Sequence, residues 1–305
     1  MSAQNTAIIA YGPDAIAEAA RLIAAGQPVA MPTETVYGLA ADATNGEAVA
    51  RIYEAKGRPS FNPLIVHVKS LAQAAEIAVF DAEARALAER YWPGPLTLVL
   101  PLRAGAPIAA LVTAGLPTVA LRSPAHPAMQ ALLDACGRPL AAPSANASGR
   151  VSPTRAEHVL ASLGGRIPLI VDAGPTALGL ESTIVASGKD GLRLLRPGPI
   201  DLGLELRSNE RVEAPGQLAS HYAPAKPLRL DATAAAPDEW LIGFGGVAGD
   251  ASLSRTGDLV EAAAKLFTLL HEADRSGPPR IAVAPVPETG IGVAINDRLQ
   301  RAATR

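Results

Sequence analysis

The sequence contains short loops in which hydroxyl and small residues follow an apolar stretch, an arrangement that suits the binding of a polar ligand. In PTETVYGLAADA, Thr33 and Thr35 supply hydroxyl groups, and Gly38 permits a close approach to the backbone. Threonine is also favoured in strands. This segment taken alone therefore fits a strand edge equally well.

A second loop of this kind, AAPSANASGRVSPT, carries hydrogen-bonding groups at Ser144, Asn146 and Ser152. Small residues dominate positions 141–149, so the backbone can pack tightly around a ligand. A polar turn would explain the serine and asparagine residues, but not the small, apolar residues that precede them. We therefore favour a ligand-binding loop.

Two cationic side chains, Lys56 and Arg58, flank a glycine in the segment KGRPSFNP, which also contains Asn62. Arginine offers a planar fork and lysine a point charge, and both can neutralise phosphate groups. Cations also suit the carboxyl end of a helix, and for this segment alone that explanation is slightly simpler. His67 lies in the apolar run LIVHV, where a histidine is more often a core residue than a ligand.

Polar residues also lie at the ends of three further apolar runs: Thr118 and Arg122 in TVALRSP, Ser182 in ESTIVAS, and Arg196 in GLRLLRPGPI. An arginine buried at a strand end must meet an anion, either a protein carboxylate or a ligand. Arg58, Arg122 and Arg196 together indicate a cavity for a multiply charged anion. Because the chain has no acidic DxD-type cluster, any Mg²⁺ would be held chiefly by ligand phosphates and water.

These loops require a scaffold of alternating helices and strands. Amphipathic periodicity predicts helices, and short β-branched runs bounded by glycine or proline predict strands. The expected helices are 14–25, 47–55, about 81–91 and 127–136, and the expected strands are 29–31, 64–68, 96–100, TVALRSP, PLAA, PLIVDAG and ESTIVAS. This alternation predicts an α/β domain over residues 1–206. The close spacing of the strands near 169–196 predicts that part of its sheet is antiparallel.

The remainder of the chain divides into a linker and a second domain. Residues 207–228 lack helical or strand periodicity, as in a linker, yet they contain His221 and Tyr222, which a spacer does not require. Beyond them, WLIGFGG and RIAVAPVP read as strands, and LVEAAAKLFTLLHEAD and GVAINDRLQRAA as helices. Residues 229–305 are therefore predicted to form a small, parallel α/β domain.

Composition excludes several classes of protein. With 49% hydrophobic and 18% charged residues, the 305-residue chain can bury a sizeable core and is not a disordered protein. A net charge of −2 lacks the basic excess of a dedicated nucleic-acid binder. Cys136 is the only cysteine, which excludes an intramolecular disulfide framework and a cysteine-clustered zinc site.

Motifs of other enzyme classes are missing as well. The sequence has no P-loop, protein-kinase set, G-x-S-x-G elbow or H-E-x-x-H. GFGGVAG lacks the glycine spacing of a dinucleotide fingerprint and is better explained as a tight turn after a strand. No secretory signal or membrane-spanning run is recognisable, so we expect a soluble, cytosolic protein without membrane contact.

The segments described above resemble a known family. In chain order, they are MPTETVYGLAADA, the K-G-R-P loop with NPLIVHV, YWPGPLTLVL, VALRSP, PLAAPSANASG, ESTIVA and LLRPGPI. Together, over about residues 12–205, they resemble the YrdC/TsaC-type threonylcarbamoyl-AMP synthase domain. ASHYAP and the tail GVAINDRLQRA resemble the longer, two-domain branch of that family.

The resemblance implies a fold and a role for each motif residue. The implied fold is a twisted mixed α/β sheet around a concave active-site cleft, followed by a small Rossmann-like domain. The residues implied to bind L-threonine are Thr35, His67, Arg122, Ala142 (through its backbone) and Ser182. The residues implied to bind ATP are Arg58, Asn62, Thr118, Ser144, Asn146, Ser152, Arg196 and Tyr222. Lys56 and Arg58 are the implied catalytic residues, and no protein side chain is implied to bind a metal.

The resemblance also implies a reaction. L-threonine, bicarbonate or CO₂, and ATP with its Mg²⁺ would give threonylcarbamoyl-AMP and pyrophosphate. The product would pass to the machinery that forms N6-threonylcarbamoyladenosine at position 37 of tRNAs, with weak RNA binding as a further expectation. Because this product is labile, exclusion of water would help, and the linker with Tyr222 is the candidate lid.

Two other functions compete with this one. An arginine-lined concave sheet could hold structured RNA by its shape, without chemistry. Neutral net charge and an aromatic content of 4% argue against that function. Carbamoyl transfer in hydrogenase maturation uses a similar domain, but those enzymes also carry cysteine-rich zinc modules, and this chain has one cysteine.

Overall fold

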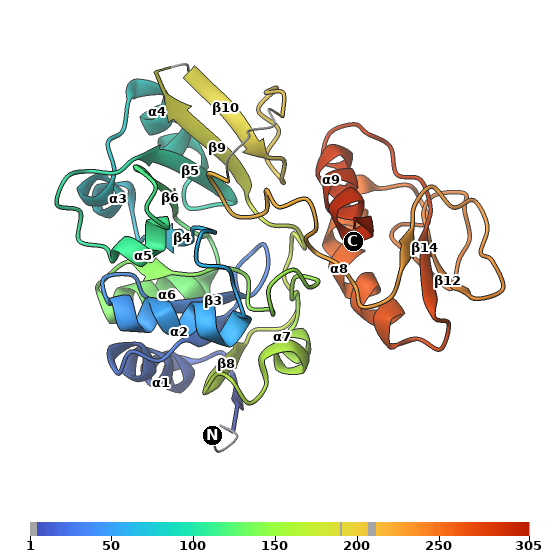
Figure 1. The fold of residues 1–305 in the computed structure, drawn as a ribbon, viewed down its shortest axis with the longest axis horizontal. Helices are drawn as coiled ribbons and strands as arrows, with labels where there is room; N and C mark the ends of the chain where they lie inside the picture. Colours follow the sequence, from blue (N-terminus) through green and yellow to red (C-terminus); the bar gives the residue numbers. More distant parts are fainter. Residues whose placement is uncertain (1–4, 190, 207–211, 305) are drawn as a thin grey trace.

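The computed structural model describes residues 5–189, 191–206 and 212–304, which form a larger and a smaller α/β body side by side (Figure 1). The larger body is built on a 10-stranded sheet with the strand order β1-β8-β2-β3-β7-β4-β6-β5-β9-β10. Its strands are β1 (Ala7–Ala10), β2 (Val29–Met31), β3 (Gly38–Asp42), β4 (Ile65–His67), β5 (Leu96–Pro101), β6 (Thr118–Arg122), β7 (Leu140–Ala141), β8 (Leu169–Asp172), β9 (Thr183–Gly188) and β10 (Gly191–Arg196). Its helices are α1 (Pro13–Ala24), α2 (Gly46–Lys56), α3 (Leu71–Ile77), α4 (Ala82–Tyr91), α5 (Ala110–Thr113), α6 (Pro127–Cys136) and α7 (Ala156–Leu163).

The large sheet is mixed, as the sequence predicted. β1 and β2 run parallel to β8, β4 runs parallel to β6, and β5 runs parallel to β9. The antiparallel pairs are β2–β3, β3–β7, β4–β7, β5–β6 and β9–β10. Antiparallel pairing near residues 169–196 is therefore confirmed for β9 and β10, whereas β8 pairs only with parallel neighbours.

The two faces of this sheet are covered differently. One face packs on α2, α4 and α7 through a large apolar cluster that includes Ile52, Val66 and Val159. On the opposite face, α1 and α6 cover β2 and β8, whereas Ala214 from the linker region covers β5, β6 and β9. Between these two covered areas lies the part of the sheet that carries the predicted site.

Helix α2 shows how the sequence fixes the cationic loop. The side chain of Asn45 accepts hydrogen bonds from the backbone N–H groups of Glu47 and Ala48, which satisfies the free donors at the start of the helix. Gly57 ends the helix with φ = 59°, a left-handed conformation that glycine adopts without strain. Lys56 is therefore the last helical residue, and Arg58 follows the turn.

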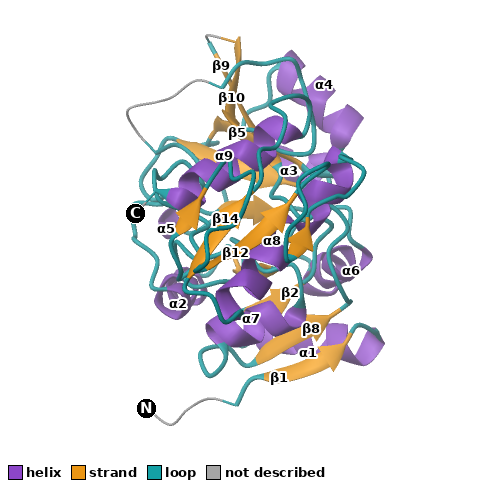
Figure 2. Ribbon diagram, turned by 90° about the vertical axis from the view of Figure 1, so that its right-hand side faces the viewer, coloured by secondary structure: helices purple, strands orange, loops and turns teal. Residues whose placement is uncertain are grey.

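The smaller body contains four parallel strands in the order β11-β14-β12-β13, which confirms the prediction of a small parallel α/β domain. Its elements are β11 (Leu228–Arg229), β12 (Glu239–Gly243), β13 (Ala251–Ser252), β14 (Arg280–Val283), α8 (Leu259–Arg275) and α9 (Gly292–Ala303). Seen from its side, this body lies in front of the large sheet, with α8 and α9 toward it (Figures 1 and 2).

The two bodies share an apolar cluster. Val36, Val151 and Leu180 of the larger body pack in the same cluster as Phe267 of α8 and Ile295 of α9. Of the predicted linker, residues 207–228, the structure describes 212–228, and the last of these, Leu228, already belongs to β11. Among the helices that the structure describes, none combines the length and apolarity needed to cross a bilayer.

Candidate active site

A pocket opens on the partly covered face of the large sheet. Ile65 and His67 of β4 point to this face because alternate residues of a strand share a face, and Arg122 pairs with His67 in the neighbouring strand. The predicted residues that line the pocket are Thr35, Arg58, His67, Arg122, Ala142, Ser144, Ser182, Arg196 and Tyr222. Segments that are far apart in the sequence thus converge on one cavity.

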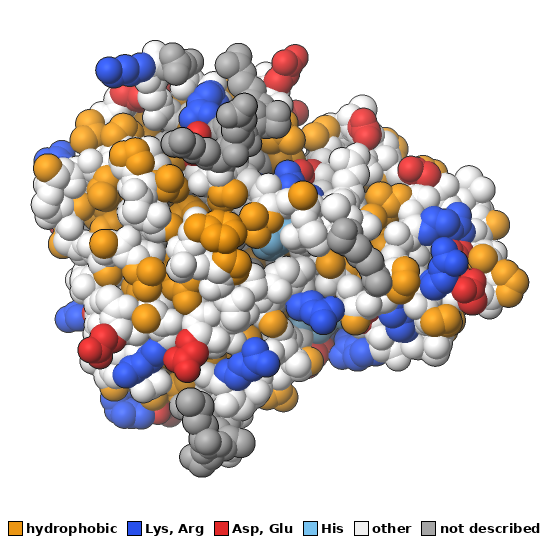
Figure 3. All heavy atoms as spheres, in the orientation of Figure 1, with side chains coloured by type: hydrophobic (Ala, Val, Ile, Leu, Met, Phe, Trp, Pro, Cys, Tyr) orange, Lys and Arg blue, Asp and Glu red, His pale blue; other side chains and the backbone are white. Residues whose placement is uncertain are grey.

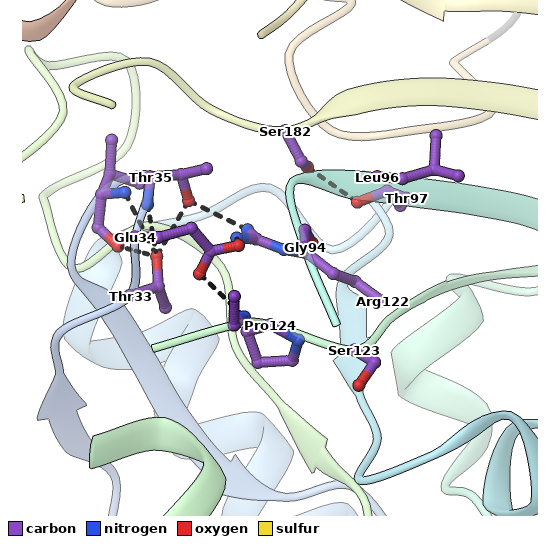
Figure 4. A network of polar contacts seen from close by, with 12 residues as sticks. Thr33, Glu34, Thr35, Gly94, Leu96, Thr97, Arg122, Ser123, Pro124 and Ser182 are labelled. Carbon is purple, nitrogen blue, oxygen red and sulfur yellow. Dashed lines mark hydrogen bonds and ion pairs between the residues drawn. The ribbon is translucent and has the colours of Figure 1, made fainter. Parts of the chain in front are cut away.

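Arg122 is paired within the protein. Its guanidinium Nη2 donates to Oε1 of Glu34 at 2.6 Å, and its Nη1 donates to the Thr35 hydroxyl at 2.9 Å (Figure 4). The other oxygen of Glu34 accepts the backbone N–H of Ala125 at 3.1 Å. Burial raises the pKa of Glu34, but the charge and hydrogen bond of Arg122 outweigh burial, so this pKa lies below its ordinary value. The sequence allowed either a protein carboxylate or a ligand as the anion beside Arg122, and the structure has a protein carboxylate there.

His67 is a neutral, buried base that faces the pocket. Burial, together with the positive charge of Arg122, holds its pKa well below 6.5. Its Nδ1 atom has no hydrogen-bond partner within the described part of the chain. A buried polar atom without a partner is costly, so this nitrogen is suited to a ligand.

Unlike Arg122, Arg58 and Arg196 form no ion pair with a carboxylate among the described residues. Arg58 donates from Nη2 to Oδ1 of Asn62 at 2.6 Å and to the Pro63 carbonyl at 2.8 Å. Arg196 donates from Nε and Nη2 to the Ser182 carbonyl at 3.1 and 2.9 Å. Across the described residues, the hydrogen bonds of both guanidinium groups go to neutral oxygens. Burial lowers the pKa of Arg58 to about 10, which still leaves it charged at neutral pH.

Ser182 connects Arg196 to strand β5. Its hydroxyl shares a 2.7 Å hydrogen bond with the Thr97 hydroxyl and accepts from Nη2 of Arg196 at 3.1 Å. Figure 4 shows Ser182 and Thr97 on the same side of the site as Arg122.

Lys56 lies behind the pocket and does not line it. Its ammonium group donates to the Ser144 carbonyl at 2.6 Å and to the Asn146 carbonyl at 2.5 Å, so it fixes the small-residue loop. Burial, together with the charge of Arg58, holds the pKa of Lys56 well below its ordinary value. Asn62, Thr118, Asn146 and Ser152 are likewise outside the pocket lining. Asn62 orients Arg58, and Thr118 lies at the opposite end of β6 from Arg122.

The linker supplies one wall of the pocket through Pro215, Gly216, His221 and Tyr222. Tyr222 is 1% exposed and has φ = 61°, and its hydroxyl has no partner in the described segments. Gly216 has φ = 88°, and a Cβ atom there would lie 2.6 Å from the Tyr222 hydroxyl. The linker therefore approaches the pocket at a distance that only glycine allows.

Three charged residues at or beside the pocket were missed by sequence reasoning: Glu34, Glu181 and Arg298. Glu34 and Glu181 lie next to motif residues, and a single charge within an otherwise uncharged segment was the available signal. Arg298 lies on the apolar face of α9, between Ile295 and Leu299, and it is fully buried. A charge on the buried face of a helix is a signal that periodicity could have detected.

Comparison with known proteins places the chain in a family. A family model described as "Telomere recombination" matches residues 21–198, and one described as "Threonylcarbamoyl-AMP synthase, C-terminal domain" matches residues 181–304. A Bacillus subtilis protein named threonylcarbamoyl-AMP synthase is 42% identical over 94% of this chain and 92% of its own length. A Pyrococcus abyssi protein of the same name is 41% identical over 93% of each chain.

The fold agrees with this assignment. The crystal structure of P. abyssi Sua5 complexed with L-threonine superposes with a TM-score of 0.89 at 37% sequence identity, covering 98% of this chain and 97% of that chain. Sequence and fold thus match over both bodies. The chain belongs to the threonylcarbamoyl-AMP synthase family, in its two-domain, Sua5-type form.

Proposed function

We propose that this chain condenses L-threonine, bicarbonate or CO₂, and ATP into threonylcarbamoyl-AMP and pyrophosphate. The observation that carries the proposal is the distribution of charge in one pocket. Arg58 and Arg196 are buried cations without an acidic partner among the described residues, whereas Arg122 is neutralised by Glu34. Unpaired buried cations favour an anionic ligand, as a triphosphate is.

Threonine fits the other half of the pocket. We assign to it Thr35, His67, Arg122, Ala142 and Ser182, all of which line the pocket. The related P. abyssi structure is a complex with L-threonine. An amino acid is a zwitterion, so an Arg–Glu pair with hydroxyl groups beside it matches its near-zero net charge better than unpaired cations would.

The chemistry requires two anions to meet. The amine of threonine adds to CO₂, or to bicarbonate with loss of water, and gives a carbamate. A carbamate oxygen then bonds to the α-phosphorus of ATP, and the bond from that phosphorus to the pyrophosphate oxygen breaks. Arg58 and Arg196 would reduce the repulsion between the two anions, and the pocket would align them. The linker wall at Tyr222 would keep water from the labile product.

Mg²⁺ enters this proposal only as a companion of ATP. In the described segments, no group of three or more His, Cys, Asp or Glu side chains could hold a metal ion. Glu34 and Glu181, which flank the pocket, are each held by an arginine. The described residues therefore offer no ligand set, the ion would be held by ATP phosphates and water, and we assign it no separate step.

Charge on the face that Figure 3 displays gives no support to an RNA-binding module. Figure 3 shows Lys, Arg, Asp and Glu side chains interspersed over the displayed face, without one continuous basic patch. The curated relatives named above are synthases. Transfer of the product to tRNA-modifying partners, weak RNA binding and a cytosolic location stay predictions from the sequence.

The decisive experiment measures pyrophosphate release with ATP, threonine and bicarbonate, and with each one left out. We expect release only with all three, and loss of at least about 100-fold in Arg58→Ala, because charge stabilisation of this kind contributes several kcal/mol. Arg85→Ala, which removes an exposed arginine of α4, is the matched control and should keep full activity. Pyrophosphate release without threonine, or full activity of Arg58→Ala, would contradict the proposal.

A further inference from the structure

The C-terminal body contributes one fully buried arginine, Arg298 of α9, to the wall behind the pocket. Its Nε atom donates to Oε2 of Glu181 at 2.9 Å, across 117 positions of sequence. Its Nη1 atom donates to Oδ2 of Asp297 at 2.7 Å, and its guanidinium carbon lies 5.2 Å from the ring centroid of Tyr222. Glu181 and Tyr222 both line the pocket.

Glu181 connects Arg298 to the half of the pocket that we assign to ATP. Its Oε1 atom accepts the Ser152 hydroxyl at 2.5 Å, and its carboxylate lies near enough to Arg196 to raise the pKa of that arginine, although burial lowers it more. Glu181 therefore interacts with Arg298, Ser152 and Arg196. Of the two arginines, only Arg298 forms a direct ion pair with it.

The energetic consequence follows from the charges. Glu181 is 5% exposed, so its negative charge is poorly screened by water. With Arg298 in place, that charge is neutralised from behind, and Arg196 stays available to a ligand anion. Without Arg298, the carboxylate would either pair with Arg196 or repel the phosphates of ATP. Asp297 would not be stranded, because it also accepts from Nε of Arg301 at 3.0 Å.

We infer that Arg298 is a positioning residue for the ATP half of the pocket. It acts through Glu181 on Ser152 and Arg196, and through its contact with the ring of Tyr222. The C-terminal body is in this way part of the active site, even though Arg298 itself does not line the pocket. The inference rests on the proposed function only in naming ATP as the anion.

The test measures ATP binding by calorimetry, with no turnover required, and the KM values for ATP and threonine by pyrophosphate release. We expect Arg298→Gln to raise the Kd and KM for ATP by about 10- to 100-fold, because one uncompensated charge acts on the phosphates at low dielectric. The KM for threonine should change less than threefold. Glu181→Gln in the Arg298→Gln background should restore most of the ATP affinity, since it removes the stranded charge.

A purely structural role predicts a different pattern. Then the second substitution would add damage instead of rescuing, and both KM values would rise together. Thr268→Val is the matched control, because it breaks a 2.9 Å hydrogen bond between Thr154 and Thr268 across the same interface without touching Glu181. It should leave ATP affinity unchanged.

Arg298→Lys keeps the charge and supplies the test if Arg298→Gln does not fold. Its ATP affinity should stay within about fivefold of the unaltered protein, and a loss as large as the one expected for Arg298→Gln would overturn the inference. So would unchanged ATP affinity in Arg298→Gln, or no rescue by Glu181→Gln. If the unaltered protein binds ATP but releases no pyrophosphate with all three substrates, the proposed function fails while the binding comparison still decides the role of Arg298.

Discussion

Replacing Gly216 by alanine tests whether the linker must approach the pocket as closely as it does in the structure. Gly216 has φ = 88°, and a Cβ atom there would lie 2.6 Å from the Tyr222 hydroxyl and 3.0 Å from Cδ of Arg196. Both side chains line the pocket. The substitution therefore acts on backbone strain and on the position of an arginine that we assign to ATP.

The loss of stability in Gly216→Ala has two parts, backbone strain and displaced side chains. Alanine in a left-handed conformation costs about 1–2 kcal/mol. Tyr222 cannot simply rotate away, because His221 and Phe267 pack on its ring with centroid distances of 4.1 and 5.6 Å. Forcing Tyr222 or Arg196 off its preferred rotamer adds about 0.5–1.5 kcal/mol for each side chain. If both side chains are displaced, we expect the free energy of unfolding to fall by about 2–5 kcal/mol.

Gly115→Ala separates strain from contact. Gly115 has φ = 79°, and a Cβ atom there would meet nothing within 4 Å. It should lose only about 1–2 kcal/mol of stability, from the backbone alone. Urea unfolding would measure both variants, and pyrophosphate release would give the KM for ATP.

The KM for ATP shows whether the close approach of the linker positions Arg196. A shift of Arg196 worth about 1.4 kcal/mol of binding corresponds to a tenfold rise in KM for ATP, and we expect at least this rise in Gly216→Ala and none in Gly115→Ala. If the two variants were equal in stability and in KM, the close approach of the linker would have no energetic consequence, and the wall formed by Tyr222 would not be a fixed part of the pocket.

Two further predictions concern the threonine half of the pocket. Glu34→Gln should lower the free energy of unfolding, measured in urea, by about 3 kcal/mol, because it leaves the buried Arg122 without its carboxylate. In initial-rate measurements it should raise the KM for threonine more than the KM for ATP. Equal rises in both KM values would contradict a local role. His67 should make the protein less stable as pH falls below 6.5, because its pKa is depressed in the folded state and the unfolded chain then binds one proton more. His67→Asn should therefore flatten the decline between pH 6.5 and 5 by up to about 1.4 kcal/mol per pH unit, and an unchanged slope would show that His67 is protonated in the folded protein.

Much of the scaffold could be predicted because its periodicity is local. α1, α2, α4 and α6 begin and end within about two residues of the expected positions, and β2 matches its expected range. Among the missed elements, α3, α7 and β1 are short or lie at the sheet edge, so too few residues repeat for a pattern to emerge. β3 is a central strand, but its residues GLAAD include no β-branched side chain to signal it. Strand order and register are set by contacts between distant segments, and the sequence of one chain does not display them.

In the site, too, local motifs could be predicted, whereas contacts between distant residues could not. Motif residues from separate segments were expected to share one cavity, and Thr35, Arg58, Arg122 and Ser182 line one pocket. Sequence reasoning left the anion of Arg122 open between a ligand and a carboxylate, since Glu34 is 88 positions away along the chain. Lys56 was expected among the catalytic groups, yet its ammonium group donates to two backbone carbonyls behind the pocket. Its catalytic role stays a prediction.

Under the proposed function, the charge pairing explains why one pocket would hold two unlike substrates without exchanging them. At the threonine end, each cation added by the protein is matched by an anion, because Arg122 is bound to Glu34. At the other end, Glu181 is neutralised from behind by Arg298, which leaves Arg58 and Arg196 in excess. A triphosphate placed at the first end would meet no uncompensated cation, and threonine placed at the second would leave two buried cations uncompensated. Selectivity between the two substrates then depends on which arginine each glutamate pairs with, more than on the number of arginines in the pocket.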